Sequence, residues 1–533
     1  MSLSRTRPVV AGLNGAVASA HPLASQAGLR ILQDGGNAVD AVVTMAAALA
    51  VVEPYMSGPG GVGFLLLNRA DGSNATLNFS GRAPAAATPD KFDIAPDLGS
   101  RACMVPGNVA GWCMALHHEG TMTLQQVFAP AIRHARDGFP LHPGNAKFIE
   151  DNRGRLNEVG LNIFSAAECR IGGVLQLPDL GNTFERISQE GPAVFYEGEI
   201  GQQIADYAQL HNGLLTREDM ATYLPKWETP IEVSYRGNTV RTCPPNNEGF
   251  QILQTLKLLE EYDLASLEHN STEYIHLLTE AIKIAVADRI QWGGDPDFRA
   301  IPIEQLLSDE YVAKRRTLIQ TDKASRSEGE RWMGPRPDHA IRSGSEGLTT
   351  HLAAVDAEGN VASITQSLGN GFGAGFFVPQ TGVALNNFIW WTEIDPDCPT
   401  PNLIEPKKRW SSCMAPVHVL RDGTFWFSIA TPGSYGILHT TLQMVLNILE
   451  FNADCQAAIE APRFRVWEDT RVQIEDRVCE NVRAELTQRG HAVELLPSFS
   501  PFVGGGQSVM IDPQSAARLA GADPRRDGYA LAY

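Results

Sequence analysis

Two adjacent threonines follow a polar stretch in the segment Gly347-Leu348-Thr349-Thr350-His351. The preceding residues, 321–347, are rich in Ser, Arg, Gly and Glu, which predicts an exposed, mobile loop. A threonine hydroxyl is a weak nucleophile without a base. If the bond between Leu348 and Thr349 is cut, the freed α-amine has a pKa of about 7.7–8.0 and can act as that base. The alternative is that both threonines are ordinary strand formers.

A hairpin is predicted to hold these threonines. Residues 348–356 and 361–368 alternate in a strand-like manner around the turn Ala357-Glu358-Gly359-Asn360. Three hydroxyl side chains share one face of the second strand: Ser363, Thr365 and Ser367. Because a core-facing strand rarely carries three hydroxyls in a row, we expect this face to line a site.

Two glycine-rich segments follow apolar elements. Residues 57–64 lack the GxxxxGK[ST] pattern and follow a helix, so close backbone packing is favoured over a phosphate site. Residues 431–436 follow the apolar strand 425–430, where glycine allows consecutive N–H groups to point the same way, as an oxyanion site requires. A plain strand-to-helix turn explains the second segment equally well.

Helices are predicted over 23–34, 38–51 (capped by Asn37), 251–262 and 272–288.

The composition excludes several classes of protein. The 533 residues are 43% hydrophobic and 20% charged, which argues against disorder, and the net charge of −18 disfavours a nucleic-acid partner. The longest apolar run, 41–52, is shorter than the roughly 18–20 residues that a bilayer needs, and the start lacks a signal-peptide core. We therefore expect a cytoplasmic protein that does not interact with membranes.

The eight cysteines form no CxxC pair and none lies near a histidine at zinc-ligand spacing. They are expected to be buried thiols in a reducing compartment. The sequence predicts neither a metal nor a cofactor.

Ordered motifs extend along almost the whole chain. They are PLAS (22–25), GGNAVDA (35–41), EP (53–54), VPG (105–107), RDG (136–138), ADR (287–289), GDP (294–296), TTH (349–351) and GADPR (521–525). Together they resemble the gamma-glutamyltranspeptidase family of N-terminal nucleophile hydrolases. This resemblance implies an α/β (α+β) fold, a four-layer αββα sandwich made as an inactive precursor. Self-cleavage would give a large chain, 1–348, and a small chain, 349–533, which stay associated; a homodimer of these heterodimers is an assembly to test.

The resemblance also assigns roles to residues. Thr349 would attack an amide carbonyl to form an acyl-enzyme, which water or an amine then resolves. The family's supporting hydroxyl, two strand residues beyond the position of Thr365, falls on Ser367. Its oxyanion pair falls on Gly433 and Ser434, where backbone N–H groups survive the change of side chain.

The residues that would bind a glutamyl group differ from the family pattern. The Gln and Asp that hold the glutamyl α-amino group fall on Phe388 and Trp391. Loss of a buried charge partner typically costs about 3–5 kcal/mol, so a glutamyl specialist should not tolerate this change. The aromatic side chains would either narrow the pocket for a short acid or form an apolar wall for a bulky acyl group.

Other glutamyl-site positions differ as well. The family's arginine falls on Ser80, with Arg82 two residues later; Arg82, with Arg409 in reserve, is the candidate that holds a substrate carboxylate. The Asn after the supporting hydroxyl becomes Gly369. The family's Ser-Ser pair falls on Ser412 and Cys413, or one residue earlier.

We therefore predict an autoprocessing amidohydrolase acting on a small non-glutamyl amide. The best single guess is oxamate, hydrolysed to oxalate and ammonia in purine breakdown. The alternatives are a glutathione hydrolase or transpeptidase, an amidase like the cephalosporin acylases, and a binding protein that has lost catalysis.

Overall fold

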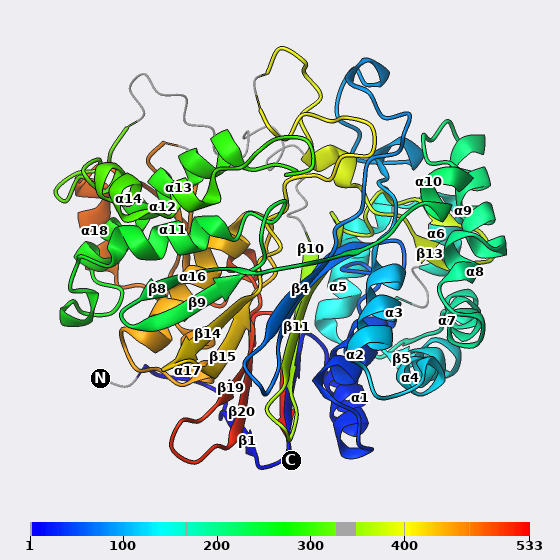
Figure 1. Cartoon of the computed structure of the whole chain (residues 1–533), viewed down its shortest axis with the longest axis horizontal. Coiled ribbons are helices and arrows are strands. Elements are labelled where there is room, and N and C mark those ends of the chain that lie inside the picture. The colour runs from blue at the N-terminus through cyan, green and yellow to red at the C-terminus, as the bar shows by residue number, and fades with distance from the viewer. Residues whose placement is uncertain (1–2, 166–168, 327–347, 399, 468) are drawn as a thin grey trace.

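Two large antiparallel sheets lie face to face in the computed structural model, which describes residues 3–165, 169–326, 348–398, 400–467 and 469–533. Helices cover the outer face of each sheet, so that the layers follow one another as helices, sheet, sheet and helices (Figure 1). This arrangement agrees with the αββα sandwich expected from the sequence.

The first sheet, here the nucleophile sheet, has the strand order β21-β2-β10-β11-β3-β4-β7. Its strands are β2 (Ala16–Ser19), β3 (Val62–Asn68), β4 (Asn74–Phe79), β7 (Lys226–Glu228), β10 (Leu348–Val355), β11 (Val361–Gly369) and β21 (Tyr529–Ala532). Strands from both sides of the predicted cleavage bond alternate in this sheet, since β10 and β11 lie between β2 and β3. The predicted hairpin is confirmed.

The second sheet, here the partner sheet, has the order β1-β20-β19-β15-β14-β9-β8. Its strands are β1 (Val10–Gly12), β8 (Ile231–Tyr235), β9 (Asn238–Thr242), β14 (Val417–Arg421), β15 (Thr424–Ala430), β19 (Gln507–Ile511) and β20 (Arg518–Ala522). Short strands elsewhere are β5 (Phe139–Pro140), β6 (Val174–Leu175), β12 (Phe377–Val378), β13 (Val383–Ala384), β16 (Phe464–Val466), β17 (Arg471–Glu475) and β18 (Ala492–Leu496).

The helices on the side of the nucleophile sheet come from the first part of the chain. They are α1 (Pro22–Gln33), α2 (Ala38–Val52), α3 (Asn108–Glu119), α4 (Leu124–Asp137), α5 (Pro143–Asn152), α6 (Glu158–Ile163), α7 (Pro178–Glu190), α8 (Ala193–Tyr196), α9 (Glu199–Leu210) and α10 (Arg217–Ala221). Helix α2 packs directly on β10 and β11 and is buried along its whole length. A capping box between Asn37 and Asp40 fixes its start, as the sequence predicts.

The helices on the side of the partner sheet are α11 (Phe250–Leu259), α12 (Thr272–Trp292), α13 (Ile303–Leu306), α14 (Asp309–Arg316), α16 (Gly436–Leu449), α17 (Cys455–Glu460) and α18 (Glu480–Gln488). Helix α12 continues four residues beyond its predicted end at Asp288. In this added turn, Arg289 donates two hydrogen bonds to Glu248.

The predicted exposed loop, 321–347, lies mostly outside the described residues. Its first residues are tied down: Ala324 N–H donates to the carbonyl of Arg489, and Ser325 N–H donates to Glu280 on α12. Residues 321–323 and 326 are exposed, as expected, whereas residues 324 and 325 are partly buried. Of the eight cysteines, all free thiols, seven are buried as expected; Cys479 is exposed.

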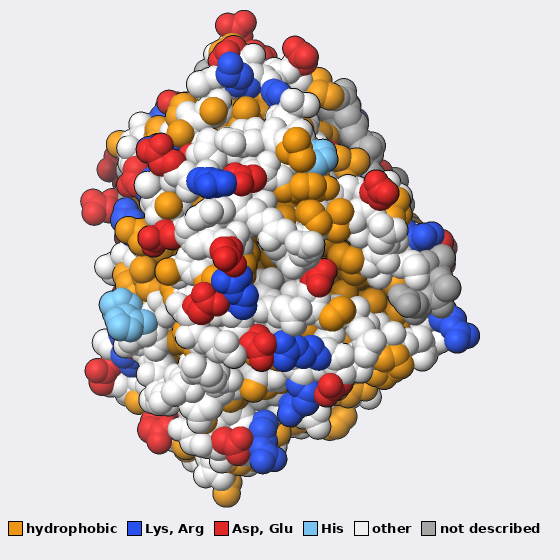
Figure 2. All heavy atoms as spheres, turned by 90° about the vertical axis from the view of Figure 1, so that its right-hand side faces the viewer, with side chains coloured by type: hydrophobic (Ala, Val, Ile, Leu, Met, Phe, Trp, Pro, Cys, Tyr) orange, Lys and Arg blue, Asp and Glu red, His pale blue; other side chains and the backbone are white. Residues whose placement is uncertain are grey.

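The surface carries charges of both signs. On the face formed by α4, α7, α8 and α9, basic and acidic side chains are interspersed with hydrophobic ones (Figure 2). Ion pairs such as Arg136–Glu185 and Arg186–Glu190 contribute to this mixture. Among the described helices, none is both long and apolar enough to cross a bilayer.

Candidate active site

Thr349 lies at the start of β10 and is 5% exposed. It is directly opposite Ser367 on β11, so the two side chains share the face turned toward the partner sheet. The pairing register shifts between Leu348 and Thr349. Such a bulge re-aims side chains and is frequent beside active sites. The predicted scissile bond thus lies at the irregularity of an otherwise regular hairpin.

The Ser367 hydroxyl is oriented toward this bond. Its Oγ donates to the carbonyl oxygen of Leu348 at 2.7 Å and accepts the N–H of Gly369 at 2.8 Å. Because the N–H of Gly369 occupies a lone pair of Oγ, the Ser367 proton is directed to Leu348. The carbonyl that a Thr349 nucleophile would attack is therefore already polarised.

The other two hydroxyls of this strand face have different partners. Thr365 Oγ lies 2.9 Å from Nδ1 of His351, and Ser363 Oγ lies 2.9 Å from Nε2 of His418 in the partner sheet. Burial lowers the pKa of His351 to about 3, which keeps its imidazole neutral. Of the three hydroxyls expected to line a site, Ser367 contacts the predicted cleavage bond, whereas Thr365 and Ser363 each contact one ring nitrogen of a buried histidine.

The turn at Gly433 and Ser434 connects β15 to α16. Both residues have positive φ angles, +134° and +58°. Among the described residues, neither backbone N–H has a hydrogen-bond acceptor. The turn packs against Gly504, whose α-carbon would be 3.5 Å from a β-carbon at position 433. Two unpaired N–H groups on a strained turn are what an oxyanion site needs.

An aromatic group stands beside this turn. Phe388 is 1% exposed and stacks on Trp410 with ring centroids 4.4 Å apart, so it belongs to the core beneath the site. Trp391 is partly buried, packs on Tyr435 at 5.5 Å, and approaches Gly369. Its buried Nε1–H has no acceptor among the described residues. Trp391 therefore offers a donor close to the hydroxyl of Ser367.

The two candidate arginines lie in one charged network. Arg409 is 4% exposed and is bound by Asp295 at 2.7 Å and Asp297 at 2.6 Å. Arg82 is one-third exposed at its side chain and lies 3.5 Å from Asp297. The charge of Arg409 is thus compensated by Asp295 and Asp297, whereas Arg82 makes only a long, partly exposed contact with Asp297.

The serines near position 412 are fully buried. Ser411 Oγ donates to Glu248 at 2.8 Å, and Glu248 accepts two hydrogen bonds of 3.0 Å from Arg289. The Arg289 guanidinium lies 4.4 Å from the ring centroid of Tyr435. Ser412 N–H donates to the carbonyl of Asn246. The buried ion pair between Arg289 and Glu248, which the sequence analysis did not predict, therefore packs against Tyr435 of the aromatic group.

The predicted close packing of residues 57–64 is confirmed. A β-carbon on Gly60 would lie 2.0 Å from the carbonyl oxygen of Ala384, and one on Gly61 would lie 2.5 Å from that of Ser367. The glycines thus allow this loop to pass directly behind the site strand.

Sequence reasoning missed two charged residues that contact the threonines. Glu53, at the end of α2, accepts a hydrogen bond of 3.3 Å from Thr350 Oγ1. Arg526 donates to the carbonyl oxygen of Thr349 at 3.3 Å. Glu53 is the first residue of the EP motif and Arg526 directly follows GADPR, but no local sequence pattern indicates that these distant residues meet the threonines.

One group of described residues has ligand atoms close enough to hold a metal: His276, Glu280 and His491. These side chains are already engaged. Glu280 pairs with Lys283 at 2.5 Å, and His276 lies 2.7 Å from both Nε2 of His491 and the carbonyl of Gln320. The group is a buried hydrogen-bonded cluster that anchors Gln320 and Ser325.

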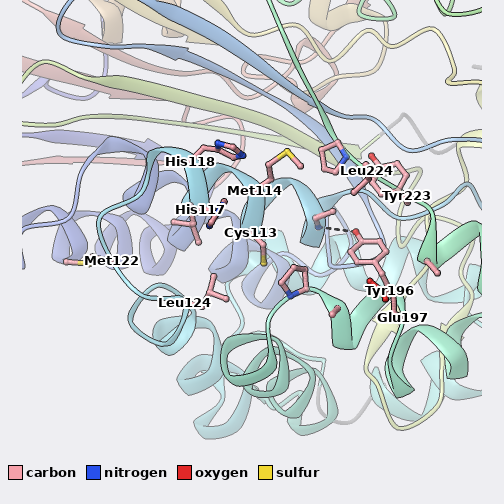
Figure 3. A pocket seen from close by; sticks show the side chains of 16 residues that line it. Cys113, Met114, His117, His118, Met122, Leu124, Tyr196, Glu197, Tyr223 and Leu224 are labelled. Carbon is pink, nitrogen blue, oxygen red and sulfur yellow. Dashed lines mark hydrogen bonds between the residues drawn. The ribbon is translucent and has the colours of Figure 1, made fainter.

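A cavity of about 540 Å³ lies among the outer helices and is lined mainly by apolar side chains. Figure 3 shows Cys113 and His117 on α3 and Tyr196 on α8 around it. Another lining residue, Tyr223, accepts the N–H of Gly81 beside Arg82. None of the predicted site residues lines this cavity.

Comparisons with known proteins identify the relatives of this chain. The sequence model of the gamma-glutamyltranspeptidase family matches residues 24–533. The chain is 35% identical to the acylase ACY 1 proenzyme of Pseudomonas sp. (strain SE83), covering 98% of this chain and 94% of that one. It is 34% identical to the glutathione hydrolase proenzyme of Escherichia coli (strain K12), covering 96% and 90%.

The fold has a close structural match. The crystal structure of cephalosporin acylase from Bacillus halodurans superposes with a TM-score of 0.91 at 31% identity, covering 99% of this chain and 98% of that one. The four-layer fold expected from the sequence is thereby confirmed.

Proposed function

Because this chain belongs to the gamma-glutamyltranspeptidase family, we propose that it is a self-processing amidohydrolase whose nucleophile is Thr349. The observation that carries the proposal is the hydrogen bond of 2.7 Å from Ser367 Oγ to the carbonyl of Leu348. A hydroxyl donor thus lies on the carbonyl of the bond that is proposed to be cut. The printed names of the two relatives, both proenzymes, agree with a precursor.

This geometry supports the following course for the proposed self-cleavage. Thr349 Oγ attacks the carbonyl carbon of Leu348, while Ser367 stabilises the negative charge on the carbonyl oxygen. The C–N bond then breaks, and the amine of Thr349 takes the proton that the hydroxyl lost. Water hydrolyses the resulting ester, which leaves a carboxylate on Leu348 and a free hydroxyl and amine on Thr349.

The two chains, 1–348 and 349–533, are proposed to stay associated. Strands β10 and β11 of the small chain are hydrogen-bonded to β2 and β3 of the large chain. Separating the chains would expose the unpaired edges and apolar faces of these buried strands. Cleavage therefore frees the amine without dividing the molecule.

The processed enzyme would hydrolyse amides by the same groups. Thr349 Oγ attacks the substrate carbonyl, its amine takes the hydroxyl proton and passes it to the leaving amine, and an acyl-enzyme forms. The unpaired N–H groups of Gly433 and Ser434 supply donors for the oxyanion. Water, activated by the same amine, releases the acid.

The acyl group is proposed to lack an α-ammonium. An ammonium beside Trp391 and Tyr435 would gain no carboxylate partner from either residue, and Glu248 behind them is already paired with Arg289. The unpartnered Nε1–H of Trp391 instead favours an acyl group with an oxygen acceptor, held against an aromatic wall. This pattern supports an acylase-like activity over a glutathione hydrolase, the second candidate suggested by the relatives.

Oxamate, the specific substrate predicted from the sequence, is not supported by the printed names of the relatives. It also needs a cation near the scissile carbonyl, and Arg409 is neutralised by Asp295 and Asp297. Arg82 remains the candidate for that role.

The test is a pair of substrates that differ only in the α-amino group. We expect the processed protein to release p-nitroaniline from glutaryl-p-nitroanilide faster than from γ-glutamyl-p-nitroanilide. Faster turnover of the γ-glutamyl substrate would contradict the acylase-like proposal and favour the glutathione hydrolase. A parallel assay of ammonia release from oxamate tests whether oxamate is a substrate.

A further inference from the structure

We propose that Arg526 and Glu53 are positioning residues that act in opposite directions on the freed α-amine of Thr349: Arg526 favours the neutral base, and Glu53 favours the ammonium. This inference rests on the proposed function, since it concerns the amine that self-cleavage creates. It concerns side chains that the mechanism above does not use.

Arg526 is placed to act on Thr349 directly. Its Nη1 donates to the carbonyl oxygen of Thr349 at 3.3 Å, and its Nη2 donates to the carbonyl of Pro501 at 3.3 Å. The side chain is 6% exposed and packs on Gly505, where a β-carbon would lie 2.8 Å from Cδ of Arg526. Because these contacts fix the guanidinium, its position does not depend on the substrate.

The guanidinium of Arg526 is close enough to the α-amine of Thr349 to affect the pKa of that amine. The α-nitrogen of a residue lies about 3 Å from its own carbonyl oxygen, so the cation stands within about 6 Å of the amine. A like charge at that distance disfavours the protonated form of an amine. Arg526 therefore increases the fraction of Thr349 amine that is neutral and able to take a proton.

Glu53 reaches the threonines from the end of α2. It ends α2 with 3% exposure, and its Oε2 accepts the hydroxyl of Thr350 at 3.3 Å. Burial raises the pKa of Glu53 to about 7, with Arg526 opposing the rise and Asp527 adding to it. When ionised, Glu53 compensates the charge of Arg526 and favours an ammonium on Thr349.

The remaining ionisable groups around this pair are few among the described residues. Asp527 lies 3.7 Å from Nδ1 of His142 and 41% of its side chain is exposed, so solvent screens its charge. Tyr55, whose pKa burial raises well above its usual value, stays neutral and bonds Asn145. Arg526 and Glu53 are thus the buried charges that act on Thr349.

The same arginine also joins the nucleophile to the oxyanion turn. Gly505, on which Arg526 packs, donates its N–H to Thr431 Oγ1 at 2.8 Å. Thr431 begins the turn that carries Gly433. Arg526 therefore holds the position of the nucleophile relative to the turn as well as the charge beside the amine.

The test measures the amine itself, without a substrate. Processed protein is treated with limiting acetic anhydride between pH 5.5 and 9.5, and acetylation of the small chain's N-terminal Thr349 is followed by mass spectrometry. The α-amine that begins the large chain serves as an internal control. We expect a labelling midpoint for Thr349 below that of an ordinary α-amine, about 7.7.

Matched variants test the direction in which each residue shifts the labelling midpoint of Thr349. Arg526→Gln should raise the midpoint and slow labelling of Thr349 at pH 7 by about three- to tenfold, whereas Arg526→Lys, which keeps the charge, should change it much less. Glu53→Gln should shift the midpoint in the opposite direction. If Arg526→Gln fails to fold, the downward shift in Glu53→Gln and the low wild-type midpoint still decide the matter.

The two possible failures are distinguishable. A cleaved protein whose Thr349 midpoint is ordinary, and unchanged in these variants, would overturn the roles of Arg526 and Glu53 while leaving the proposed function intact. A protein without any N-terminal Thr349 would overturn the proposed function and this inference together.

Discussion

The Ser367 hydroxyl donates a hydrogen bond of 2.7 Å to the carbonyl oxygen of Leu348, the residue before the predicted scissile bond. The uncut chain therefore already holds a hydroxyl donor on the carbonyl that the proposed self-cleavage would attack. The same hydroxyl accepts the N–H of Gly369, so its proton has a fixed direction. Preorganised donors of this kind lower barriers because they need no rearrangement when charge develops.

Ser367→Ala should slow self-cleavage by roughly 10²–10³-fold, the usual effect of losing one oxyanion donor. The rate is measured as loss of the full-length chain on denaturing gels after synthesis. Ser367→Thr, which keeps the hydroxyl, should cleave at a rate closer to wild type. Equal rates in all three proteins would show that Ser367 takes no part in the reaction.

Trp391→Phe should lower kcat/KM for glutaryl-p-nitroanilide by about tenfold, because a hydrogen bond to a charged acceptor contributes about 1.5–3 kcal/mol. Self-cleavage should be unaffected, since it needs no acyl ligand. Trp227→Phe is the matched control: Nε1–H of Trp227 is also buried without an acceptor among the described residues, but it lies on β7. If both variants lose the same activity, the indole N–H of Trp391 does not bind the acyl group.

Arg82 and Arg409 should respond differently to alanine. Arg82→Ala should raise KM and leave self-cleavage and stability nearly unchanged, because its pairing is exposed and loose. Arg409→Ala should cost about 3–5 kcal/mol in the free energy of unfolding, since Asp295 is left buried without its partner. Urea unfolding and steady-state kinetics separate the two effects. An unchanged KM in Arg82→Ala would place the carboxylate site elsewhere.

The raised pKa of Glu53 predicts a pH dependence of stability. A carboxyl group whose folded pKa is about 7 binds protons more tightly in the folded than in the unfolded state. The free energy of unfolding should therefore fall, by about 3 kcal/mol, as pH rises from about 4.5 to 7.

Glu53→Gln should flatten this dependence. Urea titrations in a Thr349→Ala background keep the chain intact during the measurement, and Glu358→Gln on the exposed turn is the control. A slope in Glu53→Gln equal to that of the control would show that Glu53 titrates normally.

Local features could be predicted from the sequence because short-range physics determines them. The cap at Asn37 and the hairpin of β10 and β11 follow from residue types and alternation within a few positions. The turn between β15 and α16 was also recognisable, because glycine at position 433 follows an apolar strand.

Long-range charge pairing could not be predicted in this way. Arg526 meets Thr349 across 177 positions, and Arg409 meets Asp295 across 114. No local pattern reveals that Arg409 forms ion pairs with Asp295 and Asp297. Nor does one reveal that the buried ring of Phe388 packs against Trp391. These contacts depend on how the two sheets are assembled.

The most direct test of the central claim is the intact mass of purified wild type and Thr349→Ala. We expect wild type to give two chains, 1–348 and 349–533, with Thr349 at the new N-terminus. Thr349→Ala should remain one chain of 533 residues without amidase activity. A wild-type chain that stays whole yet hydrolyses amides, or a Thr349→Ala chain cut at the same bond, would contradict the assignment of Thr349.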